Sequence, residues 1–359
     1  MNVANQVKPP DPADYRQQRQ RPPKRAPGRA KRALPWTALV AAVALVWVAV
    51  GIYGTFSYGK AYDTYRGFPP PKDPVGVAPG HLYHEKFYST ALAKKRSFLV
   101  YTPPGYRAAV ARGGRFPVLY LLHGAPGHPK KFIDVAAVGV ALDTAVNHNT
   151  IRPYIIAMPN GSDGTFRSDT EWANTPHGRY ETLVLETVRA TEHRFATLKG
   201  RRFRAIAGYS EGAYAAINIA LHHLRMFSIA ESWSGYGREH HKGPFVQATD
   251  LQIFENSPSL YAPTLTTQLQ RWPLTAYLYS GRSDKGMPGQ RHLAGVLALS
   301  GAHAHFATFP GSHDWALWRG QTPRMIRWAG RMFGRKPQPV GARPLSHGLA
   351  AMLGGRRHP

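Results

Sequence analysis

The stretch IAGYSEGAYAA, from Ile206 to Ala216, places a serine between two glycines in the pattern G-x-S-x-G. These five letters recur by chance, so their meaning depends on what surrounds Ser210. The preceding FRAIAG has the apolar character of a buried strand, and the following EGAYAAINIALHHL that of a helix. A strand that turns abruptly into a helix projects a hydroxyl above the sheet at a helix N-terminus. Ser210 is therefore predicted to be a nucleophile, with a helix-capping serine as the alternative.

A serine hydroxyl becomes nucleophilic only when a base accepts its proton and an acid orients that base. Where a strand-turn-helix carries the serine, the chain order is serine, acid, histidine. Asp284 follows the strand-like LTAYLYSG, and His313 lies in a loop after the strand-like AHFATFPG. We therefore expect Asp284 to be the acid and His313 the base. Asp314 and Glu231 are weaker candidates for the acid, and a turn or helix cap is the alternative role for Asp284.

The oxyanion that such a reaction develops needs two backbone N–H donors. One is expected from Glu211, directly after the serine, although a carboxylate is an unusual neighbour for an oxyanion. The other is expected from Ala125, in the turn LLHGAPG after an earlier strand. Three residues are candidates for the substrate pocket, with loop packing or a structural role as the alternative: His123, Trp172 and Asn174.

Strand-like and helix-like stretches alternate over about residues 81–332, which predicts where these side chains stand. Apolar runs such as PVLYLLHG and YIIAMPNG are typical of buried parallel strands. The stretch RYETLVLETVRATEHRF has helical spacing, with an acid early and basic residues late. We predict one α/β domain with a mostly parallel central sheet and helices on both faces. Such sheets carry their chemistry at the carboxyl ends of the strands.

Taken together, these stretches resemble the Putative esterase family of α/β-hydrolases. That family includes S-formylglutathione hydrolase, enterochelin esterase, feruloyl esterases and mycolyltransferases. The matching pieces are FLVYTPPGY, FPVLYLLHGAPG, IIAMPNG, RFRAIAGYSEGAYAA, YLYSGRSDK and FPGSHDWALW, in this order. The resemblance implies the α/β-hydrolase fold, a triad of Ser210, Asp284 and His313, and oxyanion donors at Ala125 and Glu211. The chain departs from the family pattern at Glu211 and Ala213, which leaves the substrate open.

The N-terminal region predicts a membrane anchor. The stretch WTALVAAVALVWVAVGIY, from Trp36 to Tyr53, holds no charged residue, and as a helix it would span about 27 Å, close to the thickness of a bilayer core. Basic residues precede it, which favours a cytoplasmic N-terminus and an extracytoplasmic domain. A cleaved signal peptide, which would leave the domain secreted, and a buried core helix are the alternatives.

The sequence thus divides into five predicted parts. These are a basic disordered cytoplasmic tail (1–35), a transmembrane anchor (36–54), a Pro-rich linker (55–80), the α/β-hydrolase domain (81–332) and a basic disordered tail (333–359). Of the net charge of +26, half lies in the terminal regions 1–35 and 331–359. Charge placed in tails argues against nucleic acid as the partner and fits anionic lipid or anionic envelope polymers.

The chain contains no cysteine, which excludes disulfides, thiolate metal sites and a cysteine nucleophile. No cofactor or metal is expected, because HLYHEK (81–86) lacks the order of a zinc motif. The predicted function is a membrane-anchored, extracytoplasmic serine esterase that cleaves carboxylic esters through an acyl-enzyme. One alternative is an acyltransferase that passes the acyl group to a sugar or lipid hydroxyl of the cell envelope. Another is a non-catalytic envelope-binding protein.

Overall fold

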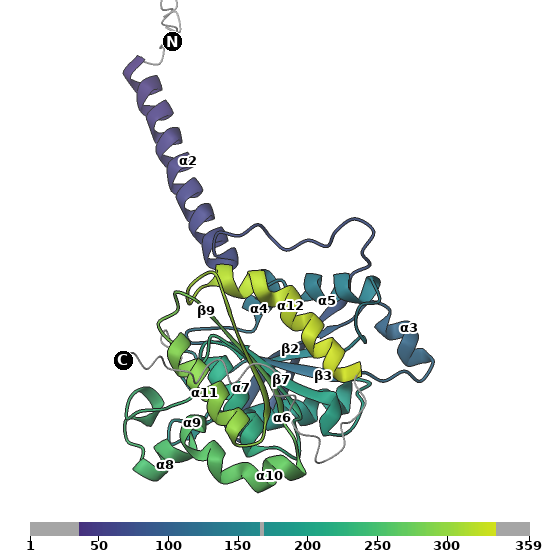
Figure 1. The fold of residues 1–359 in the computed structure, drawn as a ribbon. Helices are drawn as coiled ribbons and strands as arrows, with labels where there is room; N and C mark the ends of the chain where they lie inside the picture. Colours follow the sequence, from purple (N-terminus) through teal and green to yellow (C-terminus); the bar gives the residue numbers. More distant parts are fainter. Residues whose placement is uncertain (1–35, 166–168, 335–359) are drawn as a thin grey trace, which may run out of the picture. The chain divides into compact units, whose positions relative to one another are not determined.

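The computed structural model describes residues 36–165 and 169–334, and the two predicted tails lie outside them, apart from Phe333 and Gly334. The chain divides into two compact units, Met1–Gly59 and Lys60–Pro359. Within the larger unit, eight strands form one sheet in the order β1-β2-β4-β3-β7-β8-β9-β10 (Figure 1). The strands are β1 (His81–Ser89), β2 (Lys94–Thr102), β3 (Val118–Leu122), β4 (Ile155–Pro159), β7 (Arg204–Tyr209), β8 (Ile229–Trp233), β9 (Thr275–Gly281) and β10 (His303–Phe309).

The sheet is mostly parallel, as predicted. The neighbours from β4 across to β10 pair in parallel, whereas β2 pairs antiparallel with both β1 and β4. All five residues of β3 and of β4 are buried, which confirms the interpretation of their continuous apolar runs. Strand β1 was not expected from the sequence, because HLYHEKFYS forms a largely solvent-exposed edge with little apolar signal. A small hairpin joins β5 (Asn174–Thr175) and β6 (Gly178–Arg179).

Helices cover both faces of the sheet (Figure 1). One face packs against α4 (Lys130–Asp134), α5 (Val138–Asn147) and α12 (Trp315–Gly334). The other face packs against α6 (Tyr180–Arg194), α7 (Glu211–His222), α9 (Pro258–Tyr261), α10 (Thr266–Arg271) and α11 (Met287–Leu299). The described helices are completed by α2 (Trp36–Tyr65), α3 (Tyr106–Ala111), α8 (Asp250–Glu255) and the 3-10 turns Arg201–Phe203, Gly243–Phe245 and Ala262–Leu265.

The side chains of β3 show how the strand period builds two cores. Val118, Tyr120 and Leu122 enter the core under α6 and α7, whereas Leu119 and Leu121 enter the core under α5 and α12. Each fully buried leucine contributes about 1.5–3 kcal/mol relative to an exposed one. The two cores together therefore hold the sheet rigid beneath the loops at its carboxyl edge.

Helix α2 is longer than the predicted anchor. It runs from Trp36 to Tyr65, so residues 55–65 are helical instead of belonging to the linker. No proline interrupts the helix before Pro69, and Gly54 and Gly59 are tolerated inside it. Its most apolar 18-residue window has a mean hydropathy of 2.2 and none of that window is buried. By length and composition this helix could cross a bilayer.

The second half of the expected linker is fastened to the domain and is not a free spacer. The side-chain amide of Asn147 on α5 pairs with the backbone N–H and C=O of Ala78, at 3.2 and 2.9 Å. The Gly80 N–H donates to Asp143 Oδ2 at 2.9 Å, and Arg319 of α12 donates to the Pro69 carbonyl at 3.3 Å. The segment contains turns, and several of its backbone polar groups find partners on the domain.

A partly buried ion pair joins α6 to the end of α7. Glu181 accepts hydrogen bonds from His222 Nδ1 at 3.1 Å and from His223 Nε2 at 2.7 Å. Burial alone would raise the pKa of Glu181, but these bonds outweigh it and hold the pKa at about 2. Burial lowers the pKa of His222, and its hydrogen bond with Glu181 more than reverses this, so the net shift is upward. The charged pair therefore stabilises the folded state in mildly acidic solution.

Replacing Glu181 by glutamine is expected to lower the free energy of unfolding by about 1–3 kcal/mol near pH 6. The contribution of Glu181 is complete above the unfolded pKa near 4.5 and is lost as the pH falls towards 2. That of His222 is complete below the unfolded pKa near 6.5 and is lost at higher pH. Urea unfolding of the full-length chain between pH 3 and 9 measures the difference in unfolding free energy between the parent and Glu181→Gln. Replacing the exposed Asp250 by asparagine is the control. A difference that does not change with pH would contradict the ion pair.

Candidate active site

Ser210 stands at the sharp turn between β7 and α7. Strand β7 ends at Tyr209 and α7 begins at Glu211, so the serine alone makes the turn. Its backbone has φ 56° and ψ −122°, a conformation that side chains rarely adopt. Its N–H donates to the Trp233 carbonyl on β8 at 3.0 Å, which ties the turn to the neighbouring strand. A strained serine at the carboxyl edge of a parallel sheet is the arrangement that the G-x-S-x-G motif requires.

The two motif glycines let the turn pack against β3. A Cβ on Gly208 would lie 2.4 Å from the carbonyl oxygen of Leu122 and 2.4 Å from backbone atoms of Gly212. A Cβ on Gly212 would lie 2.0 Å from the same Leu122 oxygen. Both contacts are with backbone, which cannot turn away as a flexible side chain could. Glycine is therefore required at both positions by close approach.

The structure brings His313 and Asp284 to this serine. His313 Nε2 lies 2.9 Å from Ser210 Oγ, and His313 Nδ1 lies 3.0 Å from Asp284 Oδ2. An Nδ1–H donated to the carboxylate leaves Nε2 free to accept the serine proton. The Asp284 side chain is only 4% exposed, whereas the His313 side chain is 42% exposed and faces solvent. This arrangement can remove a proton from Ser210 and hold the resulting imidazolium in place.

Two loops hold the acid and the base in register. The β9–α11 loop carries Asp284, whose Oδ1 accepts the Gly286 N–H at 2.8 Å. The β10–α12 loop carries His313, and its Gly311 carbonyl accepts the Ser283 N–H at 3.0 Å. The Trp318 ring of α12 packs edge-on against His313 with ring centroids 5.1 Å apart. The separation of Asp284 and His313 is therefore fixed by backbone contacts between their loops.

The two other acids considered from the sequence have different partners. Asp314 accepts hydrogen bonds from Ser312 Oγ at 2.5 Å and from the Leu317 N–H at 2.9 Å, so it caps the start of α12. Glu231 lies buried on β8 and accepts the Trp233 ring N–H at 2.9 Å. Burial raises the pKa of Glu231 to about 8. Asp284 is therefore the acid whose contacts fit the predicted role.

The two predicted oxyanion donors come from two different segments, the start of α7 and the loop after β3. The Glu211 N–H opens α7, where the first backbone donors of a helix have no partner within it. Ala125 lies in the loop after β3, and Gly124 beside it packs so closely that a Cβ there would lie 3.0 Å from Ser210 Cβ. Glu211 thus follows Ser210 at the start of α7, and Ala125 belongs to the loop whose Gly124 packs against Ser210. Their role as donors stays a prediction.

The predicted pocket residues have structural contacts. His123 is 1% exposed, with Nδ1 3.0 Å from the Gly124 carbonyl and Nε2 accepting the Gly161 N–H at 3.0 Å. Burial lowers the pKa of His123 to about 4, so the ring is neutral. Trp172 is also 1% exposed and donates to the His123 carbonyl at 2.9 Å. Asn174 is exposed and accepts from the Thr182 N–H of α6 at 3.1 Å. These contacts support the alternative of a structural role.

The sequence did not predict a group of acids beside the nucleophile. Asp169, Glu171 and Glu211 lie together, and Glu211 Oε1 accepts hydrogen bonds from the N–H and the hydroxyl of Thr170, at 3.1 and 3.2 Å. Burial, followed by the charges of Glu171 and Asp169, raises the pKa of Glu211 well above its ordinary value. A protonated Glu211 puts no full negative charge beside the oxyanion donors. The only signal in the sequence was the unusual glutamate after Ser210.

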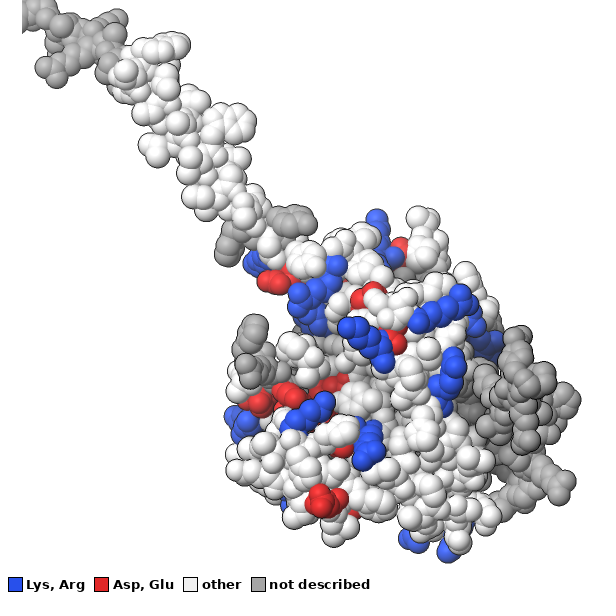
Figure 2. Space-filling model, turned by 60° about the vertical axis from the view of Figure 1, so that its left-hand side comes forward, with Lys and Arg blue, Asp and Glu red and all other residues white. Residues whose placement is uncertain are grey.

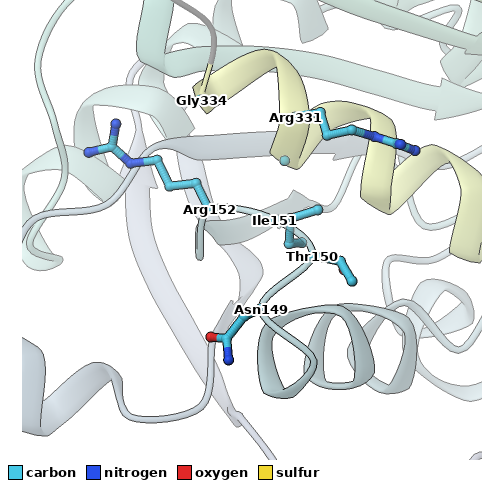
Figure 3. Close-up of a pocket in the computed structure, with 7 residues that line it drawn as sticks. Asn149, Thr150, Ile151, Arg152, Arg331 and Gly334 are labelled. Carbon is cyan, nitrogen blue, oxygen red and sulfur yellow. The ribbon is translucent and has the colours of Figure 1, made fainter.

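A shallow pocket elsewhere on the domain is separate from these residues (Figure 3). It is lined by Asn149, Thr150, Ile151, Arg152, Gly330, Arg331 and Gly334. Residues 149–152 precede β4, so this pocket lies at the amino ends of the parallel strands, whereas Ser210 follows a carboxyl end. In Figure 3 the side chains of Arg152 and Arg331 point to opposite sides. None of the predicted site residues lines it.

Comparison with known proteins identifies the relatives of this chain. A model of the family described as Putative esterase matches residues 89–329. An endo-1,4-β-xylanase/feruloyl esterase of Xylanibacter ruminicola is 28% identical over 149 residues, which are 41% of this chain and 20% of that protein. An esterase of Mycobacterium tuberculosis is 29% identical over 155 residues, which are 43% of this chain and 32% of that protein. The matches thus span between a fifth and a third of these curated relatives.

Solved structures share the fold of the larger unit. A ferulic acid esterase superposes with a TM-score of 0.64 at 22% sequence identity, over 71% of this chain and 100% of that one. Its whole length therefore corresponds to the region built on the eight-stranded sheet. The likeness identifies the architecture as the α/β-hydrolase fold, which confirms the fold predicted from the alternation of strands and helices.

Proposed function

Because this chain belongs to the Putative esterase family, we propose that it is a carboxylic ester hydrolase whose catalytic residues are Ser210, His313 and Asp284. One observation carries the proposal. A continuous pair of hydrogen bonds, 2.9 and 3.0 Å long, links the serine hydroxyl through the imidazole to a buried carboxylate. The names of the relatives, which include feruloyl esterases, support ester cleavage as the reaction class.

In the proposed reaction, Ser210 Oγ attacks the carbonyl carbon of the ester while His313 Nε2 takes the hydroxyl proton. Asp284 keeps the imidazole in the tautomer that can accept this proton. The oxyanion accepts hydrogen bonds from the Ala125 and Glu211 N–H groups, and the loss of one such donor would cost about 10²–10³-fold in kcat. His313 then gives its proton to the leaving alcohol. Water, activated by the same histidine, hydrolyses the acyl-enzyme.

We further propose that helix α2 anchors the enzyme in a membrane, with the larger unit on the extracytoplasmic side. The helix is uncharged over residues 36–53 and long enough to span a bilayer core, which supports the anchor. The basic residues before Trp36 support a cytoplasmic N-terminus. The substrates would then be esters reached from outside the membrane. Tail lysines and arginines would meet anionic lipid or envelope polymers.

Ester cleavage can be tested directly on the full-length chain in detergent. We expect turnover of nitrophenyl esters of graded acyl length, together with methyl ferulate as suggested by the relatives. Adding glycerol or trehalose separates hydrolysis from transfer, because a transferase would yield the acylated alcohol in place of the free acid. Hydrolysis with no acylated alcohol supports the esterase, and mainly acylated alcohol would favour the acyltransferase. A folded protein that cleaves and transfers nothing would leave only a binding protein.

A further inference from the structure

The acids beside the nucleophile converge on one point. Asp169 and Glu171 come from the loop after β4, and Glu211 comes from the first residue of α7. Each offers a carboxylate oxygen, and the three oxygens lie within 4.8 Å of one another. Two oxygens bound to the same Ca²⁺ at 2.3–2.6 Å can be at most about 5 Å apart. The spacing is therefore that of ligands around one ion.

Two buried oxygens beside this point accept no hydrogen bond from the described residues. They are Oε2 of Glu211 and Oε1 of Glu239, a residue of the loop after β8. Glu211 is 4% exposed and Glu239 only 1%. Burial, together with the charges of Glu171, Asp169 and Glu211, raises the pKa of Glu239 to about 10. A buried carboxylate oxygen without a donor is costly unless a cation or a proton meets it.

Among the described residues, negative groups outnumber positive ones around these acids. The cation that lowers the pKa values of Asp169, Glu171 and Glu239 there is Lys242. Lys242 is exposed and forms no ion pair among the described residues. Hydrogen bonds come from Thr170 to Glu211 and from the Tyr236 hydroxyl to Glu171. The Glu171 N–H also donates to Asp169, and among the described residues no donor meets Oε2 of Glu211 or Oε1 of Glu239.

We propose that Asp169, Glu171 and Glu211 bind a divalent metal ion of the oxygen-preferring kind, with Ca²⁺ as the best fit. All three ligands are carboxylates, and Ca²⁺ takes six to eight oxygen ligands in flexible geometry. The carboxyl of Glu239 interacts electrostatically with all three of them. Asp169 is exposed, which gives the ion a path from solvent and leaves room for water ligands.

The ion would act as a support for the catalytic turn. Glu211 is both a ligand and the residue whose N–H is the proposed oxyanion donor, so a bound ion would tie that donor to the loop carrying Asp169 and Glu171. A cation there also neutralises the carboxylate beside the nucleophile. The ion takes no part in bond making or breaking, and its binding does not depend on Ser210 as a nucleophile.

Terbium luminescence tests the site on the full-length chain in detergent, after treatment with a chelator and its removal. Tb³⁺ replaces Ca²⁺ at oxygen sites, and the Tyr236 ring, whose hydroxyl contacts Glu171, can sensitise it. We expect saturable luminescence that Ca²⁺ competes away. Ca²⁺ at a hundred times its dissociation constant should raise the thermal midpoint by about 5–10 °C. The Ser210→Ala variant should behave identically, so the result does not depend on the proposed function.

Variants separate this site from scattered surface acids. Glu171→Gln and Asp169→Asn should each weaken Ca²⁺ binding by at least about tenfold. The control Glu255→Gln removes an exposed carboxylate of α8 outside the group and should change nothing. Without metal, Glu171→Gln removes repulsion between neighbouring carboxylates, so its thermal midpoint should be no lower than that of the parent. This measurement shows whether the variant is folded. Absent luminescence, or equal Ca²⁺ binding by Glu171→Gln and Glu255→Gln, would overturn the proposed metal site. The carboxyl groups would then be neutralised by protons that they share.

Discussion

Replacing Ser210 by alanine is expected to lower kcat for ester hydrolysis by about 10⁴–10⁶-fold, to the level of residual catalysis by bound substrate and oxyanion donors. The hydroxyl that His313 contacts at 2.9 Å is the sole atom removed, and alanine keeps the rest of the turn. The φ of 56° is strained for either residue, so the fold should be retained. Steady-state rates and covalent labelling by a fluorophosphonate probe measure the loss.

The matched control is Ser312→Ala, in the loop that carries His313. Its hydroxyl donates to Asp314 at 2.5 Å and does not contact Ser210, so activity should fall only a few-fold at most. Labelling that persists in Ser210→Ala would show that another hydroxyl is the nucleophile. Equal losses in both variants would show that the loop, and not the Ser210 hydroxyl, limits the reaction.

The central elements could be predicted because their signals are local. The apolar runs of β3 and β4 are buried from end to end, and the G-x-S-x-G stretch lies where its flanking patterns required. Chain order, together with positions just after predicted strands, selects Asp284 and His313 in a sequence with 17 histidines. That order works because parallel strands return each loop to the same edge of the sheet.

The acids around Glu211 could not be predicted in the same way. Asp169 and Glu239 are 70 residues apart in sequence, and their proximity depends on how two irregular loops fold back over α7. No periodic pattern describes such loops. The prediction of a Pro-rich linker was incomplete for a related reason. Pro-rich composition predicts an extended backbone, but it does not predict hydrogen bonds between this segment and the side chains of Asn147 and Asp143.

The pocket candidates illustrate a third limit. The sequence places His123 in the turn after a strand and Trp172 in the stretch SDTEWANTPHGRYE, and it leaves pocket lining and structural packing open as alternatives. In the structure the two rings pack edge-on with centroids 4.9 Å apart, and a ring nitrogen of each forms a hydrogen bond with a backbone group. Residue type does not reveal burial, which depends on neighbours from β3 and the following loops.

Replacing Asp284 by asparagine is expected to lower kcat by about 10⁴-fold while leaving the site's shape unchanged. An amide can donate to His313 Nδ1, which would hold the imidazole with its proton on Nε2 and leave no acceptor for the serine proton.

Asp314→Asn is the matched control one residue beyond the histidine. It alters a helix cap, so it should cost about 1 kcal/mol or less in stability and little activity. Rates and thermal midpoints of the two full-length variants separate these effects. If Asp314→Asn, and not Asp284→Asn, abolished turnover, the acid would have to be reassigned. The expected contrast would instead show that the buried carboxylate acts through the imidazole, because Asp284 contacts His313 whereas Asp314 contacts Ser312 and Leu317.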